Sequence, residues 1–152
     1  MTLANPGFVL IIASISSSLA AQMVKIIASL IKSGKLEWRI LLRTGGMPSS
    51  HSAMIACLAT GIGMIDGFGS TNFALALCFA MIVMYDAAGV RRAVGMQGKL
   101  LNEMLAELLE DSHDLRMSKI KELLGHTPFE VLVGAIFGSL IAVLVCKAWI
   151  SI

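Results

Sequence analysis

The segment Pro128–Trp149, PFEVLVGAIFGSLIAVLVCKAW, decides the fold class of this chain. It carries charge only at Glu130 and Lys147, close to its two ends, and it matches the roughly 20 apolar residues that a helix needs to cross a bilayer. Residues 8–31, 48–65 and 73–90 have the same apolar character. A chain of 152 residues is too short to bury four such helices in a soluble core. The sequence therefore predicts an all-α, polytopic helical membrane protein with about four transmembrane helices.

The composition supports a membrane protein and excludes several other classes. The chain is 57% hydrophobic and 14% charged, whereas soluble domains have about 25% charged residues. Its length suits one domain, residues 1–152, and its net charge of +2 is too small to predict a nucleic-acid partner. The three cysteines lie in apolar runs without a C-x-x-C pair, which predicts neither a disulfide framework nor a zinc site. The first apolar segment lacks the basic start of a secretory signal and is expected to be a retained span.

One stretch outside the apolar segments has a helical pattern of its own. Between residues 96 and 109, Met and Leu recur at helical spacing with Glu between them. This pattern predicts an amphipathic helix that lies on the membrane or against a partner. Four short spans also leave an open flank where a second copy of the chain could bind.

The basic residues predict an orientation in the cytoplasmic membrane. Four spans place both termini and the 66–72 turn on one face, and the 32–47 and 91–126 segments on the other. Every Lys and Arg except Lys147 lies within or near the second face. By the positive-inside rule that face is cytoplasmic, with both termini outside.

The unusual polar residues of the span ends gather on this same cytoplasmic face. Ionisable groups at membrane depth are costly and usually face a bundle interior or a water-filled cavity. The segment Arg43–Ser52, RTGGMPSSHS, adds a glycine pair and a proline suited to the first turn of a helix, where free N–H groups favour an anion. The candidate site residues are Lys25, Arg43, Ser49, Ser50, His51, Asp86, Arg91, Arg92, His126 and Glu130.

This set fits phosphoryl chemistry. The cations would bind phosphate oxygens, one histidine would attack phosphorus, and the other would protonate the leaving oxygen. The acidic residues on this face are too few for a dinuclear metal site, so neither a metal nor another cofactor is expected.

Structural alternatives stand beside these roles. Thr127-Pro-Phe-Glu130 is a capping box that would finish a helix start. Arg91 and Arg92 would serve as topology anchors or as partners of Asp86, and Lys25 would extend to the interface.

Gly134 and Gly138 form the small-residue motif of membrane helices. This motif more often reports packing inside one bundle than a dimer.

Two segments resemble a known family. At Gly45–His51, GGMPSSH, and Tyr85–Arg92, YDAAGVRR, the chain resembles the divergent branch of the type-2 phosphatidic acid phosphatase family, whose members are also described as acid phosphatase/vanadium-dependent haloperoxidase-related membrane proteins. The resemblance covers nearly the whole chain, from Asn5 to Glu130. It implies a metal-independent lipid phosphatase that works through a phosphohistidine, with the last four spans of the six-span parent fold.

The resemblance also implies roles for individual residues. Pro48-Ser49-Ser50-His51 matches the parent motif Pro-Ser-Gly-His except for one serine, which makes His51 the general acid. His126 and Glu130 keep the spacing of the third parent motif, which makes His126 the nucleophile and Glu130 its orienting acid.

The phosphate-binding residues follow less directly from the parent motifs. Lys25 and Arg43 would take the roles of the first motif, although the chain has no Arg-Pro pair. The Ser-Arg of the third motif is absent, so Arg91, Arg92 or Lys121 would supply that cation. Ser49 and Ser50 would add N–H groups, and Asp86 is a candidate orienting residue.

The sequence therefore predicts an integral membrane phosphatase that hydrolyses a lipid phosphate or pyrophosphate. The first alternative is a non-catalytic binder or transporter of lipid phosphates that keeps the anion site. A third reading is a structural subunit that docks a partner through residues 96–109.

Overall fold

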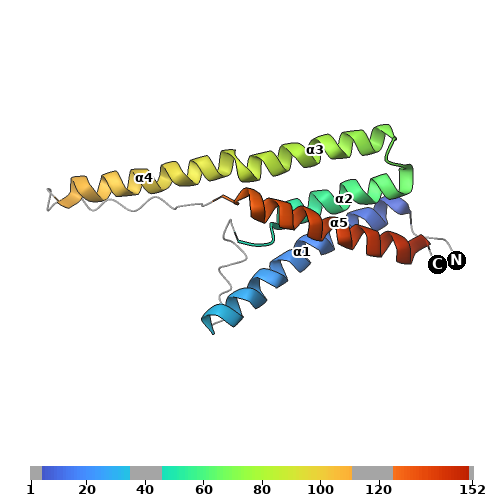
Figure 1. The fold of residues 1–152 in the computed structure, drawn as a ribbon, viewed down its shortest axis with the longest axis horizontal. Helices are drawn as coiled ribbons and strands as arrows, with labels where there is room; N and C mark the ends of the chain where they lie inside the picture. The colour runs from blue at the N-terminus through green and yellow to red at the C-terminus, as the bar shows by residue number, and fades with distance from the viewer. Residues whose placement is uncertain (1–4, 35–45, 111–124, 151–152) are drawn as a thin grey trace.

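The computed structural model describes residues 5–34, 46–110 and 125–150, and all regular structure in these ranges is helical. Within the described ranges five helices follow one another: α1 (Pro6–Ser33), α2 (Ser50–Asp66), α3 (Thr71–Ala88), α4 (Val90–Glu110) and α5 (Pro128–Ile150) (Figure 1). Three helices are long and apolar enough to cross a membrane, namely α1, α5 and the helix that runs from α3 into α4. The protein is therefore an all-α membrane protein, as the sequence predicts.

The shortest helix, α2, lies at the centre of the bundle. It contacts α1, α3 and α5, and its buried positions are small residues, among them Ala53, Cys57 and Gly61. Small residues let helix backbones approach closely within a membrane. A Cβ atom at Gly138 of α5 would collide with the backbone of Ala53, and one at Gly134 would collide with the backbone of Ser49. The two-glycine motif therefore packs α5 against α2 within one chain.

The helices begin at polar caps that the local sequence supplies. The Asn5 side chain accepts from the N–H of Gly7 at the start of α1, and Ser70 accepts from the N–H of Phe73 at the start of α3. At the start of α2 the Ser49 oxygen accepts from both the N–H and the hydroxyl of Ser52. Because Ser49 takes the cap position, Pro48 lies outside the helix, and the prediction that it occupies the first turn is wrong.

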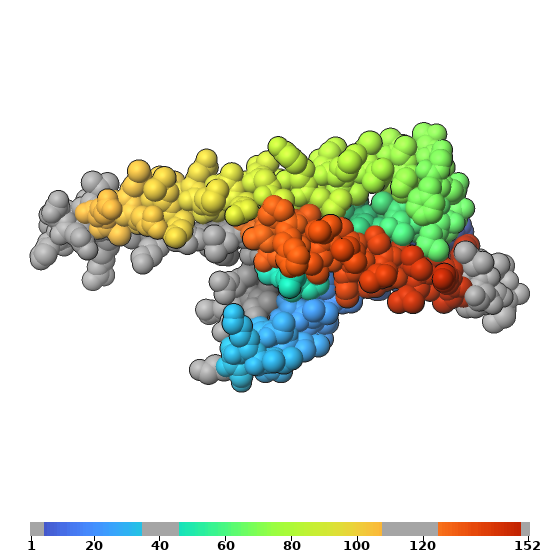
Figure 2. Space-filling view, viewed as in Figure 1, coloured from blue at the N-terminus to red at the C-terminus, as the bar shows by residue number. Residues whose placement is uncertain are grey.

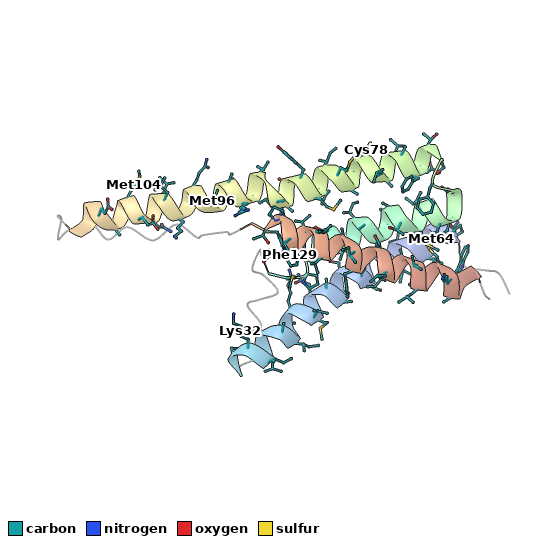
Figure 3. The ribbon with its side chains drawn as sticks, viewed as in Figure 1. Lys32, Met64, Cys78, Met96, Met104 and Phe129 are labelled. Carbon is teal, nitrogen blue, oxygen red and sulfur yellow. The ribbon has the colours of Figure 1, made fainter. Side chains whose placement is uncertain are left out.

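The amphipathic helix α4 continues almost directly from α3 after a break at Gly89. It extends well beyond the bundle, and among the described helices it contacts α3 alone (Figures 1 and 2). Met96 and Met104 lie along this projecting part (Figure 3). The helix predicted over residues 96–109 is confirmed and begins earlier, at Val90.

The bundle has two different ends. The start of α1, the end of α5 and the turn between α2 and α3 lie together at one end (Figure 1). The start of α2, the joint between α3 and α4, and the start of α5 lie toward the other, which we call the site end.

Candidate functional site

The start of α5 is fixed against the joint between α3 and α4. The N–H of His126 donates to the carbonyl oxygen of Ala87 at 3.2 Å. A Cβ atom at Gly125 would collide with the backbone of Arg91 and Arg92, so the two segments are in direct contact there. Glycine is therefore required at position 125 for this approach, and His126 enters the bundle at a fixed place.

The His126 side chain is buried and has an unpartnered nitrogen. The residue is 4% exposed, and its Nε2 atom has no hydrogen-bond partner in the part of the chain that the structure describes. Buried polar atoms in native proteins are nearly always paired, so the unpaired Nε2 is a candidate ligand-binding atom. Burial lowers the pKa of His126 below its ordinary value, and the positive charge of Lys25 lowers this pKa further, while the negative charge of Glu130 raises it. The imidazole is therefore held in its neutral form.

His51 comes to the same place from the first turn of α2. The N–H of Ser49 donates to the carbonyl oxygen of Glu130 at 3.2 Å, which ties the start of α2 to the start of α5. His51 and His126 line one small cavity, together with Val83, Asp86, Ala87 and Arg91. The cavity measures about 20 Å³, which is the room that about one water molecule needs.

Asp86 and Arg91 form an ion pair on the wall of this cavity. The Arg91 Nε donates to the Asp86 Oδ2 at 2.6 Å, with the two side chains 51% and 37% exposed. The structure therefore confirms the pairing of an arginine with Asp86 and selects Arg91 for it. Arg92 does not line the cavity, although its backbone supports Gly125.

Lys25 reaches the site from α1. It is only 6% exposed, so it is buried within the protein and does not extend to the membrane interface. Gly46 lies against it, since a Cβ atom there would stand 3.9 Å from the Lys25 Cδ. Gly46 has a φ of 83°, a conformation that favours glycine, so the loop before α2 passes close to the Lys25 side chain.

Glu130 has a structural role that the sequence also predicts. Its Oε2 accepts from the N–H of Thr127 at 2.9 Å, and its own N–H donates to the Thr127 Oγ1 at 3.3 Å. This is a complete capping box at the start of α5. The two serines predicted to bind phosphate, Ser49 and Ser50, are both buried at the start of α2, and the Ser49 hydroxyl oxygen is engaged with Ser52. Arg43 lies outside the described residues.

Three residues of the site were not predicted from the sequence. Val83 and Ala87 line the cavity, and Ala87 also accepts the backbone bond of His126. Ser52 donates its N–H and its hydroxyl to the Ser49 oxygen beside His51 in the first turn of α2. Val83 lies one turn before Asp86, Ala87 directly follows Asp86, and Ser52 directly follows His51. This closeness in sequence to a predicted site residue was the available signal.

Comparisons with known proteins identify the family of this chain. Residues 7–141 match the family described as "Divergent PAP2 family". The chain belongs to the divergent PAP2 family. It is also 38% identical over 141 residues to a Bacillus subtilis (strain 168) protein described as "Uncharacterized membrane protein YuiD", covering 86% of this chain and 89% of that one. No solved structure is significantly similar to the chain. The divergent PAP2 family resemblance drawn from GGMPSSH and YDAAGVRR is thus confirmed.

Proposed function

We propose that this protein is a membrane phosphohydrolase that removes phosphate from a lipid phosphate or pyrophosphate. The observation that carries the proposal is the shared cavity, in which His51 of α2 and His126 before α5 meet beside Arg91, with the Nε2 of His126 buried and unpartnered. Two histidines and a cation around one cavity supply a nucleophile, a proton donor and an anion-binding group. Membership of the divergent PAP2 family supports the same chemistry by analogy.

The first chemical step uses the neutral form of His126. Its Nε2 lone pair attacks phosphorus, and the bond from phosphorus to the lipid oxygen breaks. His51, in its protonated form, gives its proton to the leaving alkoxide. The lowered pKa of His126 keeps its lone pair available at neutral pH.

The second step returns the enzyme to its starting state. Water attacks the phosphohistidine, His51 takes one of its protons, and the bond between Nε2 and phosphorus breaks to release inorganic phosphate. Lys25 and Arg91 stabilise the negative charge that develops on the phosphoryl oxygens in both steps.

Substrate binding requires the site to open. A cavity for about one water does not hold a phosphate group, so Arg91 must leave Asp86 and turn to the phosphate. Both side chains of this ion pair are at least one-third exposed, and exposed pairs contribute only about 0–1 kcal/mol. Exchanging the Asp86 carboxylate for the substrate phosphate at Arg91 therefore costs little free energy.

The site is proposed to face the cytoplasm. Lys25, Lys32, Arg91 and Arg92 lie toward the site end, whereas Lys147 lies near the other. A cysteine introduced at Ser33, in a variant with Cys78→Ser, tests this orientation with a membrane-impermeant thiol reagent. Labelling in intact cells would refute a cytoplasmic site, and labelling only after permeabilisation is expected.

The deciding experiment measures phosphate release by purified protein in detergent against a panel of lipid phosphates and pyrophosphates. Release is expected from the unmodified protein and should be lost in His126→Ala and His51→Ala. Arg92→Gln is the matched control, because Arg92 neighbours Arg91 and does not line the cavity. Full activity in His126→Ala would refute the mechanism.

A second candidate is a binder or transporter of lipid phosphates. The engagement of the Glu130 carboxylate in the cap of α5 favours it over turnover, because the mechanism needs that carboxylate to orient His126. It predicts lipid-phosphate binding that depends on Lys25 and Arg91, with no phosphate released.

A further inference from the structure

One side of α2 is open between α1 and α3. Both helices pack against α2, but among the described residues they make no contact with each other. An apolar cleft of about 490 Å³ lies between them, toward the end of the bundle opposite the site end. Its main lining residues are Leu10, Leu58, Ile62, Ile65, Leu75 and Phe79. This volume lies within the usual range of ligand sites, about 300–1,000 Å³.

The cleft and the polar cavity lie along the same face of α2. Leu58 and Ile65 line the cleft, and they stand about two and four helical turns after His51. Residues separated by whole turns project from the same side of a helix. His51 itself is exposed, so this side of α2 is only partly covered at the site end, where Val83, Asp86 and Ala87 of α3 flank it.

The helices that wall the cleft, α3 and α1, also extend from the cleft toward the site end. On α3, Phe79 and Leu75 stand about two and three turns before Asp86, so the same side of α3 lines the cleft and the polar cavity. On α1, Gly7 at the cleft and Lys25 at the site are about five turns apart. The cleft between α1 and α3 therefore continues along α2 and α3 to the polar cavity. We call this path the α1/α3 groove: it is apolar at one end and carries His51 and Asp86 at the other, with Lys25 buried nearby in α1.

We propose that the α1/α3 groove holds the hydrocarbon chain of the substrate, an inference that rests on the proposed function. An amphiphile with an anionic head and an apolar chain matches the groove from end to end, with the head between the cations and the chain over Leu58 and Ile62. The groove opens to the bilayer, so the chain enters sideways from the lipid and the head never crosses the hydrocarbon core.

The length of the groove sets a minimum length for the hydrocarbon chain of the substrate. His51 and Ile62 are separated by about 17 Å along α2, which is about half of the 30 Å hydrocarbon core. A chain that spans one leaflet therefore reaches the cleft from a head at His51, and a short chain does not. The groove predicts a preference for long-chain phosphates over short-chain or soluble ones.

The test uses an alkyl phosphate with a photoreactive diazirine at the end of a leaflet-length chain. The probe is added to the purified protein in detergent, and the labelled residues are mapped by mass spectrometry. Labelling is expected on the cleft residues of α2 and α3. Labelling spread equally over the exposed residues of α5, such as Leu132 and Leu140, would overturn the groove.

Two variants test the groove through their effects on labelling and on hydrolysis. Leu58→Trp narrows the cleft and should reduce labelling and long-chain hydrolysis at least tenfold, while hydrolysis of phenyl phosphate stays within twofold. Ile136→Trp, on the exposed side of α5, is the matched control and should change neither. Unchanged labelling in Leu58→Trp would overturn the proposal.

The two proposals fail in different ways. Protein that is labelled in the cleft but releases no phosphate refutes the phosphohydrolase and retains the groove. Protein that releases phosphate and is not labelled in the cleft refutes the groove alone.

Discussion

The contact between α5 and α2 leads to a prediction about one methyl group. In Gly138→Ala the new Cβ would meet the carbonyl oxygen, carbonyl carbon and Cα of Ala53. All three are backbone atoms, so no side-chain rotation can relieve the collision and α5 must move away from α2. The same movement would separate the two helix starts that carry His51 and His126.

The size of the effect follows from two opposing contributions. Overpacking of a tight contact costs about 1–3 kcal/mol, and the close approach to three backbone atoms of Ala53 places this position at the upper end. Alanine gains about 1 kcal/mol over glycine in a helix. The net loss is therefore about 2 kcal/mol. At roughly 2–4 °C for each kcal/mol in a protein of this size, the melting temperature should fall by about 4–8 °C.

The same substitution in α4 provides the control. Gly98 has nothing within 4 Å of a Cβ atom, so Gly98→Ala should raise stability by up to about 1 kcal/mol. Thermal unfolding of both purified variants in one detergent measures the two shifts. If Gly138→Ala melts at or above the temperature of Gly98→Ala, the packing of α5 on α2 described above is wrong.

Three further predictions concern the site and α4. The charge of Lys25 lowers the pKa of His126, so Lys25→Met should move the acid limb of the pH profile of kcat/KM to higher pH. The charge of Glu130 raises this pKa, so Glu130→Gln should move the acid limb to lower pH. An acid limb at the same pH in both variants would contradict the placement of these charges. Ser49→Ala removes the cap of α2 and should cost about 1 kcal/mol, measured by thermal unfolding against the unmodified protein. Leu101→Asp changes an exposed residue of α4 and should alter the unfolding free energy by no more than about 0.5 kcal/mol, whereas a loss of folded protein would show that α4 packs against the bundle.

Features that depend on neighbouring residues were predictable from the sequence. The apolar segments predicted the bounds of α1, α2, α3 and α5 to within a few residues, because a membrane helix is marked by about 20 consecutive apolar residues in the sequence itself. The capping box of Thr127 and Glu130 was predictable for the same reason, since both partners lie within one turn. The gathering of polar residues at one end followed from the alternation of the spans across the bilayer.

Features that depend on helix rotation were not predictable. Arg91 and Arg92 are adjacent in sequence and point about 100° apart on a helix, so only the packed structure distinguishes the one that lines the cavity. The approach of Gly125 to the α3–α4 joint joins segments that are distant in sequence. Pro48 was misplaced because proline and serine both suit a helix start, and the hydrogen bonds of Ser49 decide between them.

The joint at Gly89 has a mechanical consequence for the whole molecule. On one side of it stands α4, an arm that projects beyond the bundle, and on the other side Ala87 holds the backbone of His126. Gly125 rests on the first turn of that arm. While these contacts persist, α4 cannot swing without shifting His126 relative to His51. A force applied at the outer end of α4 would thus change the distance between the two imidazoles.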